Sequence, residues 1–73
     1  MERDAINLTF SHPWMTVSDA KLLLAHAYNR FKKHEKYGGD IVNTLMKIEY
    51  GIFQRSSEEH MRARLDLIKS QLV

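Results

Sequence analysis

The four histidines are the residues best suited to bind a metal ion, but their spacing argues against a metal site. They stand at positions 12, 26, 34 and 60, and the chain has no cysteine. His34 begins the sequence HEKYG, which starts like the zinc-binding pattern H-E-x-x-H but has Gly38 where the second histidine must stand. His26 and His34 would lie about 12 Å apart along a helix, too far to share one ion. We therefore expect no metal and no cofactor.

Groups that could perform catalysis are also few. Ser11 precedes His12, but no serine or threonine has the spacing to a histidine that is typical of an activated nucleophile. Glu49 falls within an apolar helix face, where a carboxylate needs a partner or its pKa rises. It could serve as a general acid or base. We favour a salt bridge to a neighbouring helix or a side chain that reaches solvent, because the sequence indicates no second polar group. We expect no catalytic residues and no enzyme.

Length and composition limit the kind of protein. Seventy-three residues form at most one domain, and a core this small commonly depends on efficient helix packing or on oligomerisation. The net charge of +2 is weak evidence for nucleic-acid binding. The first ten residues lack the apolar region of a signal peptide, and the aliphatic run at 22–25 is too short to span a bilayer. We expect a cytoplasmic protein that does not enter membranes.

The hydrophobic pattern predicts an all-α fold, either a small three-helix bundle or a helical hairpin followed by a C-terminal helix. An extended N-terminal arm at residues 1–15 is expected to precede a single helical domain at residues 16–73. Within the arm, the sequence INLTF alternates apolar and polar residues, which predicts a short strand. Pro13 discourages a helix from crossing it, and Trp14 is expected to lie against the bundle and hold the arm in place.

Local signals place the helix boundaries. The first helix is expected at residues 18–36 with Ser18 as its N-cap, and the sequence YGGD at 37–40 predicts a tight turn with Asp40 capping the next helix. The second helix is expected at 41–55 and the third at 57–72. One continuous helix from 41 to 73 is the alternative, which Gly51 and the serine pair at 56–57 disfavour.

Two apolar rows make the second helix the expected centre of the fold. One row is Ile41, Leu45, Ile48 and Ile52, and the other is Val42, Met46, Tyr50 and Phe53. The third helix carries one narrow stripe, which consists of Met61, Leu65, Ile68 and Leu72.

Basic residues gather near the end of the first helix, on the face opposite its apolar residues. They can simply complement the negative end of the helix dipole in solvent. They can also form a docking surface for an acidic partner, anchored by one aliphatic side chain. The candidate partner-binding residues are Leu22, His26, Arg30, Lys33 and Lys36.

Two classes of function follow. The first is a small regulatory protein that binds a larger protein, of the kind that phages and mobile elements encode as inhibitors or transcription regulators. The second is a dimeric DNA-binding protein, because INLTF resembles the strand of ribbon-helix-helix repressors. That resemblance implies a two-stranded ribbon with Asn7 and Thr9 facing the major groove. We favour the protein-binding regulator with an acidic partner, keep nucleic acid as the alternative, and leave a homodimer open.

Overall fold

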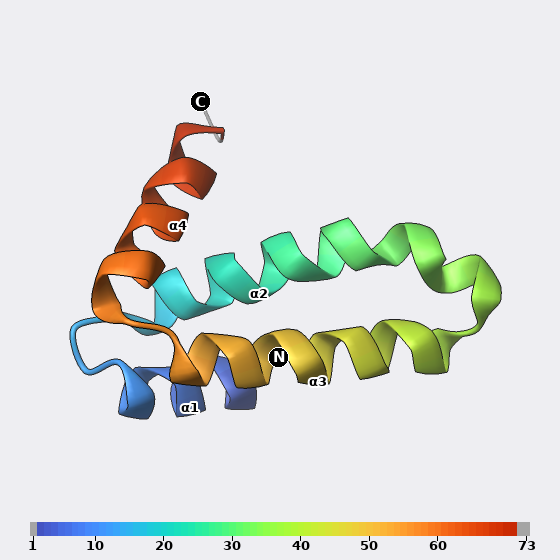
Figure 1. Ribbon diagram of the computed structural model, residues 1–73, viewed down its shortest axis with the longest axis horizontal. Coiled ribbons are helices and arrows are strands. Elements are labelled where there is room, and N and C mark those ends of the chain that lie inside the picture. The colour runs from blue at the N-terminus through green and yellow to red at the C-terminus, as the bar shows by residue number, and fades with distance from the viewer. Residues whose placement is uncertain (1, 72–73) are drawn as a thin grey trace.

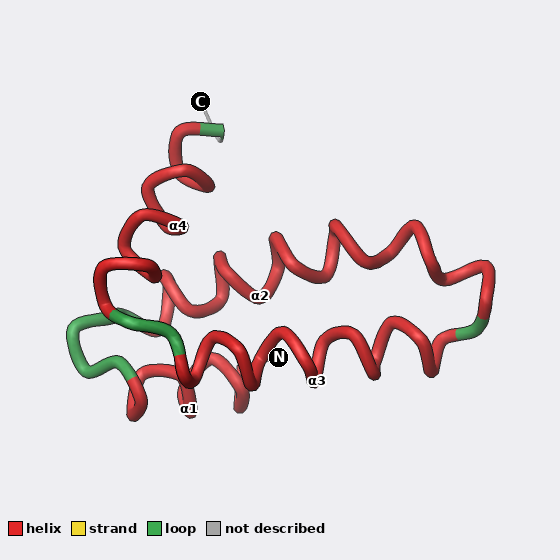
Figure 2. Tube along the Cα trace, viewed as in Figure 1, coloured by secondary structure: helices red, strands yellow, loops and turns green. Residues whose placement is uncertain are grey.

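The computed structural model describes residues 2–71, and these residues form an all-α protein without strands (Figure 1). The predicted all-α class is confirmed. Helices α2 and α3 form an antiparallel hairpin, which a short 3-10 helix, η1, connects at its closed end (Figure 2). The elements are α1 at Glu2–Ser11, α2 at Val17–Phe31, η1 at Lys32–Tyr37, α3 at Gly39–Arg55 and α4 at Glu58–Ser70.

Helix α1 replaces the extended arm and the short strand, so both of those predictions are wrong. Ala5 and Leu8 are fully buried, whereas Ile6 and Phe10 of the supposed strand face are exposed. The buried set continues at His12 with spacings of three and four residues, which is helical periodicity. The pattern was missed because its members include a small residue and a polar one.

The boundary at residue 15 between arm and helical domain stays a prediction. Ala5 and Leu8 belong to the same core as the buried residues of α2, α3 and α4. Residues 1, 72 and 73, including Leu72 of the expected C-terminal stripe, lie outside the described residues.

We call the connection between α1 and α2, at residues 12–16, the elbow, and side-chain contacts hold it against the other helices. The carbonyl oxygen of Phe53 in α3 accepts a hydrogen bond from Nε2 of buried His12, at 2.6 Å. Trp14 packs against the core, as predicted, and the guanidinium carbon of Arg62 lies 4.4 Å from the centre of its ring. The elbow therefore ties the end of α1 to both α3 and α4.

Capping residues set where the helices begin, although not at every predicted residue. Thr16, rather than Ser18, caps α2: its hydroxyl accepts from the backbone N–H of Asp19, and the Asp19 carboxylate accepts from the backbone N–H of Thr16. Helix α3 begins at Gly39, so Asp40 lies inside the first turn instead of capping it. Gly38 makes the turn with a φ of +113°, which side chains disfavour.

The chain breaks between α3 and α4 at residues 56–57, where Ser57 caps α4 through the backbone N–H of His60. The prediction of two helices is therefore confirmed over the described residues. Helix α4 turns away from α3 and crosses the start of α2 (Figure 1).

Helix α2, not α3, is the central helix, and our prediction on this point is wrong. Helix α2 contacts α1, α3 and α4, and four of its side chains are almost completely buried. Helix α3 buries only one of its two apolar rows, and Ile48 in the other row is 56% exposed. The four buried side chains of α2 are Ala20, Leu23, Leu24 and Ala27.

Replacing Leu8 by alanine tests whether α1 is part of the core. A buried leucine truncated in this way costs about 2–5 kcal/mol of unfolding free energy, because transfer energy is lost and a cavity is left. Phe10→Ala is the matched control on the same helix, since Phe10 is 77% exposed and its loss should change stability by less than about 0.5 kcal/mol. Urea unfolding measures both, and equal effects would contradict the position of α1.

The ion pair at the start of α2 predicts an acid-dependent stability. Partial burial acts to raise the pKa of Asp19, but hydrogen bonds from Lys69 and Thr16 together outweigh it and lower that pKa. The Lys69 ammonium lies 3.1 Å from the Asp19 carboxylate and joins α4 to α2. A lowered carboxyl pKa stabilises the fold above the unfolded value, and that contribution is lost as the pH falls through the folded value.

Asp19→Asn should therefore reduce stability at neutral pH. Below about pH 4 the stability of this variant should fall less steeply with pH than that of the wild type. Asp66→Asn, a change at an exposed aspartate of α4, is the control. Thermal unfolding followed by circular dichroism across this pH range measures the difference. Parallel pH profiles for the wild type and Asp19→Asn would show that the ion pair contributes nothing.

Candidate protein-binding surface at the hairpin tip

Part of the predicted docking face on α2 is partly buried. Leu22 and His26 are partly buried, and Leu22 packs against the core. They lie three and seven residues after Asp19, on the same side of α2, and Asp19 pairs with Lys69 of α4. Helix α4 therefore lies near this side of α2, and Leu22 and His26 are less accessible to a partner than an exposed residue would be.

Arg30, the third predicted residue, forms an ion pair inside the molecule. Its guanidinium donates to the carboxylate of buried Glu49 in α3, and Nη2 of Arg64 in α4 lies 3.9 Å from the same carboxylate oxygen. The predicted salt bridge of Glu49 is confirmed, and it joins three helices. The carboxylate is held by two guanidinium groups, so the geometry favours a structural role over acid–base chemistry.

Lys33 and Lys36, the last two predicted residues, lie in η1 at the closed end of the hairpin, and both are exposed. In a 3-10 helix, side chains three residues apart lie one above the other. Lys33 and Lys36 therefore share a row that contains no acidic residue. The neighbouring row pairs Lys32 with Glu35.

The third row of η1 is aromatic. The rings of His34 and Tyr37 are stacked with their centres 6.5 Å apart, and the ammonium of Lys36 lies 5.1 Å from the centre of the Tyr37 ring. Tyr37 is nevertheless 64% exposed. We call Lys32, Lys33, Lys36 and Tyr37 the basic tip. Among the described residues, none of its lysines takes part in an ion pair.

The closed end of the hairpin projects beyond α1 and α4 (Figure 1). A flat target can therefore meet the basic tip without meeting the other two helices. The sequence indicated the lysines of this surface, because clustered charge is visible in any conformation. It did not indicate Tyr37, which we had assigned only to the turn; the three-residue spacing from His34 is the signal that identifies it once the 3-10 helix is known.

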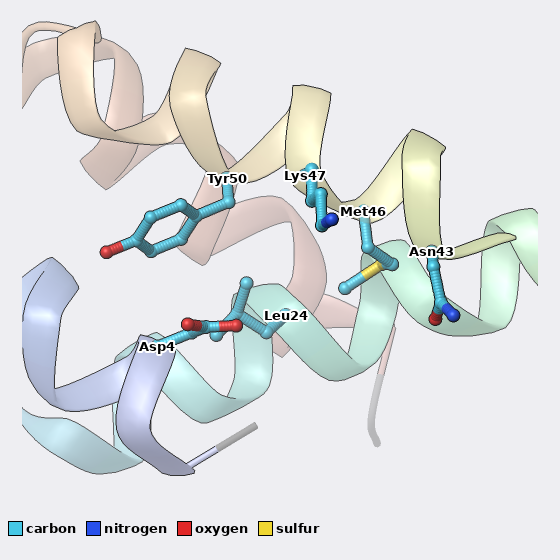
Figure 3. Close-up of a pocket in the computed structure, with 6 residues that line it drawn as sticks. All are labelled: Asp4, Leu24, Asn43, Met46, Lys47 and Tyr50. Carbon is cyan, nitrogen blue, oxygen red and sulfur yellow. The ribbon is translucent and has the colours of Figure 1, made fainter. Parts of the chain in front are cut away.

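A pocket of about 360 Å³ lies between the start of α1 and the hairpin (Figure 3). Apolar and polar groups are mixed in its wall, and its lining contains no histidine or serine. Within residues 2–71, no three acidic or histidine side chains are arranged to hold a metal ion. The residues that line the pocket are Asp4, Leu24, Asn43, Met46, Lys47 and Tyr50.

No protein-family model, curated protein or solved structure matches the chain. In the described part of the chain, no helix combines the length and the apolar character needed to cross a bilayer.

Glu49→Gln tests the charge cluster that joins the three helices. Removing the negative charge leaves Arg30 and Arg64 without their shared partner and should lower the unfolding free energy by about 1–2 kcal/mol, since solvent screens the partly exposed Arg30. Glu35→Gln, at an exposed site in η1, should have little effect. Chemical denaturation of both variants is the measurement, and an unchanged Glu49→Gln variant would contradict a stabilising role.

Proposed function

We propose that the protein is a small regulatory protein without enzymatic activity, and that it acts by binding an acidic surface of a larger protein through its basic tip. The observation that supports this proposal most strongly is the row of Lys33 and Lys36 beside the exposed ring of Tyr37. Tyrosine is enriched in protein interfaces, and a positive patch can complement the negative patch of a partner.

The two kinds of side chain would contribute differently. The lysines attract an acidic surface from a distance and raise the rate of encounter more than the final affinity. Tyr37 can bury a large ring at small entropic cost and supply a hydrogen-bonding hydroxyl, as binding hot spots often do. Together they favour a partner with an acidic rim around an apolar recess.

The proposed regulator works in the cytoplasm, as an inhibitor or a transcription regulator of the type that mobile elements encode. Binding by contact alone is consistent with the ion pairs that hold the Glu49 carboxylate. DNA binding through a ribbon loses its structural basis, because Asn7 and Thr9 lie in helix α1. Contact between the basic tip and a nucleic-acid backbone is the competing outcome of the test below.

Charge reversal at the basic tip tests the proposal. Lys33→Glu combined with Lys36→Glu should weaken binding to the partner at least about tenfold, a change of roughly 1.4 kcal/mol. The matched control reverses Lys47 and Arg3, two exposed cations outside the tip, and should keep nearly all of the affinity. A third variant, Tyr37→Ala, separates the aromatic contribution from the charge.

The measurement is affinity capture from a host lysate, followed by titration of the captured protein against each variant at two salt concentrations. A partner that binds the wild type and the tip variant equally would contradict the proposal. Capture of nucleic acid, with a steep loss of affinity as salt rises, would replace it with the phosphate-binding alternative.

A further inference from the structure

The outer face of α3 carries an apolar row in which three of the four members are exposed. Its members are spaced by four, three and four residues, which is the spacing of the contact positions in a coiled coil. Ile41, Ile48 and Ile52 are 38%, 56% and 43% exposed, and Leu45 is partly buried. We call these four residues the α3 stripe. A row of this kind with its contact side in solvent is typical of a helix that pairs with another helix.

The geometry points to a second copy of this chain as the occupant: we propose that two molecules pair through their α3 stripes, with the two α3 helices antiparallel. The spacings of four, three and four residues have the same order in both directions along the helix. A two-fold axis through the middle of the stripe therefore sets Ile41 opposite Ile52 of the second copy, and Leu45 opposite its Ile48. Each copy contributes the same patch, as closed two-fold interfaces require.

The charges at the ends of the stripe fit the antiparallel direction. Asp40 stands one residue before the stripe and Arg55 three residues after it. In the antiparallel register, Arg55 lies within two residues of the level of Asp40 on the second copy, so opposite charges meet at both ends. A parallel pair would set aspartate against aspartate and arginine against arginine, which is unfavourable.

The surface of α3 also has a hollow in the position that this register needs. A depression of about 220 Å³ is lined by Asp40, Ile41, Thr44 and Leu45. In coiled coils, a side chain of one helix enters a hole made by four residues of the facing helix. The register places Ile52 of the second copy over this hollow.

One edge of the stripe is formed by small residues, which allow close approach of two helices. Thr44 and Gly51 lie seven residues apart on this edge, and the three atoms nearest to a Cβ atom added at Gly51 all belong to the end of the flexible Arg55 side chain. The two-fold arrangement brings Thr44 near Gly51 of the second copy. Helix axes can therefore come together far enough for the four apolar residues to interdigitate.

The size of the contact predicts a reversible dimer. The stripe is about 17 Å long, and a contact along one helix per copy falls at the low end of specific interfaces. Pairing should therefore depend on concentration. The basic tips would point in opposite directions, so this inference does not depend on the proposed partner binding.

Sedimentation equilibrium over a range of protein concentrations tests the inference. The wild type should shift from monomer to dimer as concentration rises, and Ile48→Lys should stay monomeric at every concentration while keeping its circular dichroism spectrum. Leu67→Lys is the control, because Leu67 is similarly exposed, at 61%, but lies on α4. A wild type that is monomeric throughout, or an Ile48→Lys variant that still dimerises, would overturn the proposal.

Cross-linking tests the relative direction of the two α3 helices. The chain has no native cysteine, so only the introduced thiols can form disulfides. A mixture of Ile41→Cys and Ile52→Cys chains should form a disulfide-linked heterodimer on mild oxidation. Ile41→Cys alone should not, because the antiparallel register holds its two copies about 17 Å apart along the helix. Efficient cross-linking of Ile41→Cys with itself would overturn the antiparallel arrangement.

The charges at the ends give an independent check on the same register. Asp40→Arg and Arg55→Asp should each weaken dimerisation, because each sets like charges against one another. The double variant restores opposite charges at both ends and should recover the wild-type dissociation constant. If the effects of the two single changes simply add in the double variant, these residues do not meet. That result would overturn the register.

Discussion

The burial of α2 on three sides is the constraint on which the rest of the structure depends. A chain of this length can bury only about 60% of its unfolded surface, so it cannot enclose two helices completely. Ala20 and Ala27 let neighbouring helices approach α2 closely, and α1, α3 and α4 all pack against it. As a result, other helices cover α3 along one side only.

The surfaces of the molecule follow from that arrangement. Where α4 approaches the hairpin, Glu49 is buried and needs cations, and Arg30 and Arg64 supply them from two different helices. Beyond the reach of α1 and α4, the hairpin is a bare two-helix layer that ends in the basic tip. The α3 stripe and the basic tip are therefore both consequences of having too few elements to cover a long hairpin.

Local features such as turns and helix ends could be predicted from the sequence. Which helix faces pack against one another could not. The turn at Gly38 and the break at residues 56–57 were predictable, because a positive φ and a capping serine act within a few residues. The buried face of α3 was not, because both of its rows are apolar and only the packing of the other helices decides between them. Lys33 was correctly expected to be exposed, whereas the packing of Leu22 against the core had no local signal.

The accessibility of the five isoleucine methyl groups tests the account most directly, because one label reports on the core, the free surface and the α3 stripe. A soluble paramagnetic probe should leave Ile68 unaffected and should broaden Ile6 at every protein concentration. Ile48 and Ile52 should be broadened in dilute protein and protected as concentration rises. Protection of Ile48 equal to that of Ile68 in dilute protein would contradict the central position of α2, and accessibility that never changes with concentration would contradict pairing through α3.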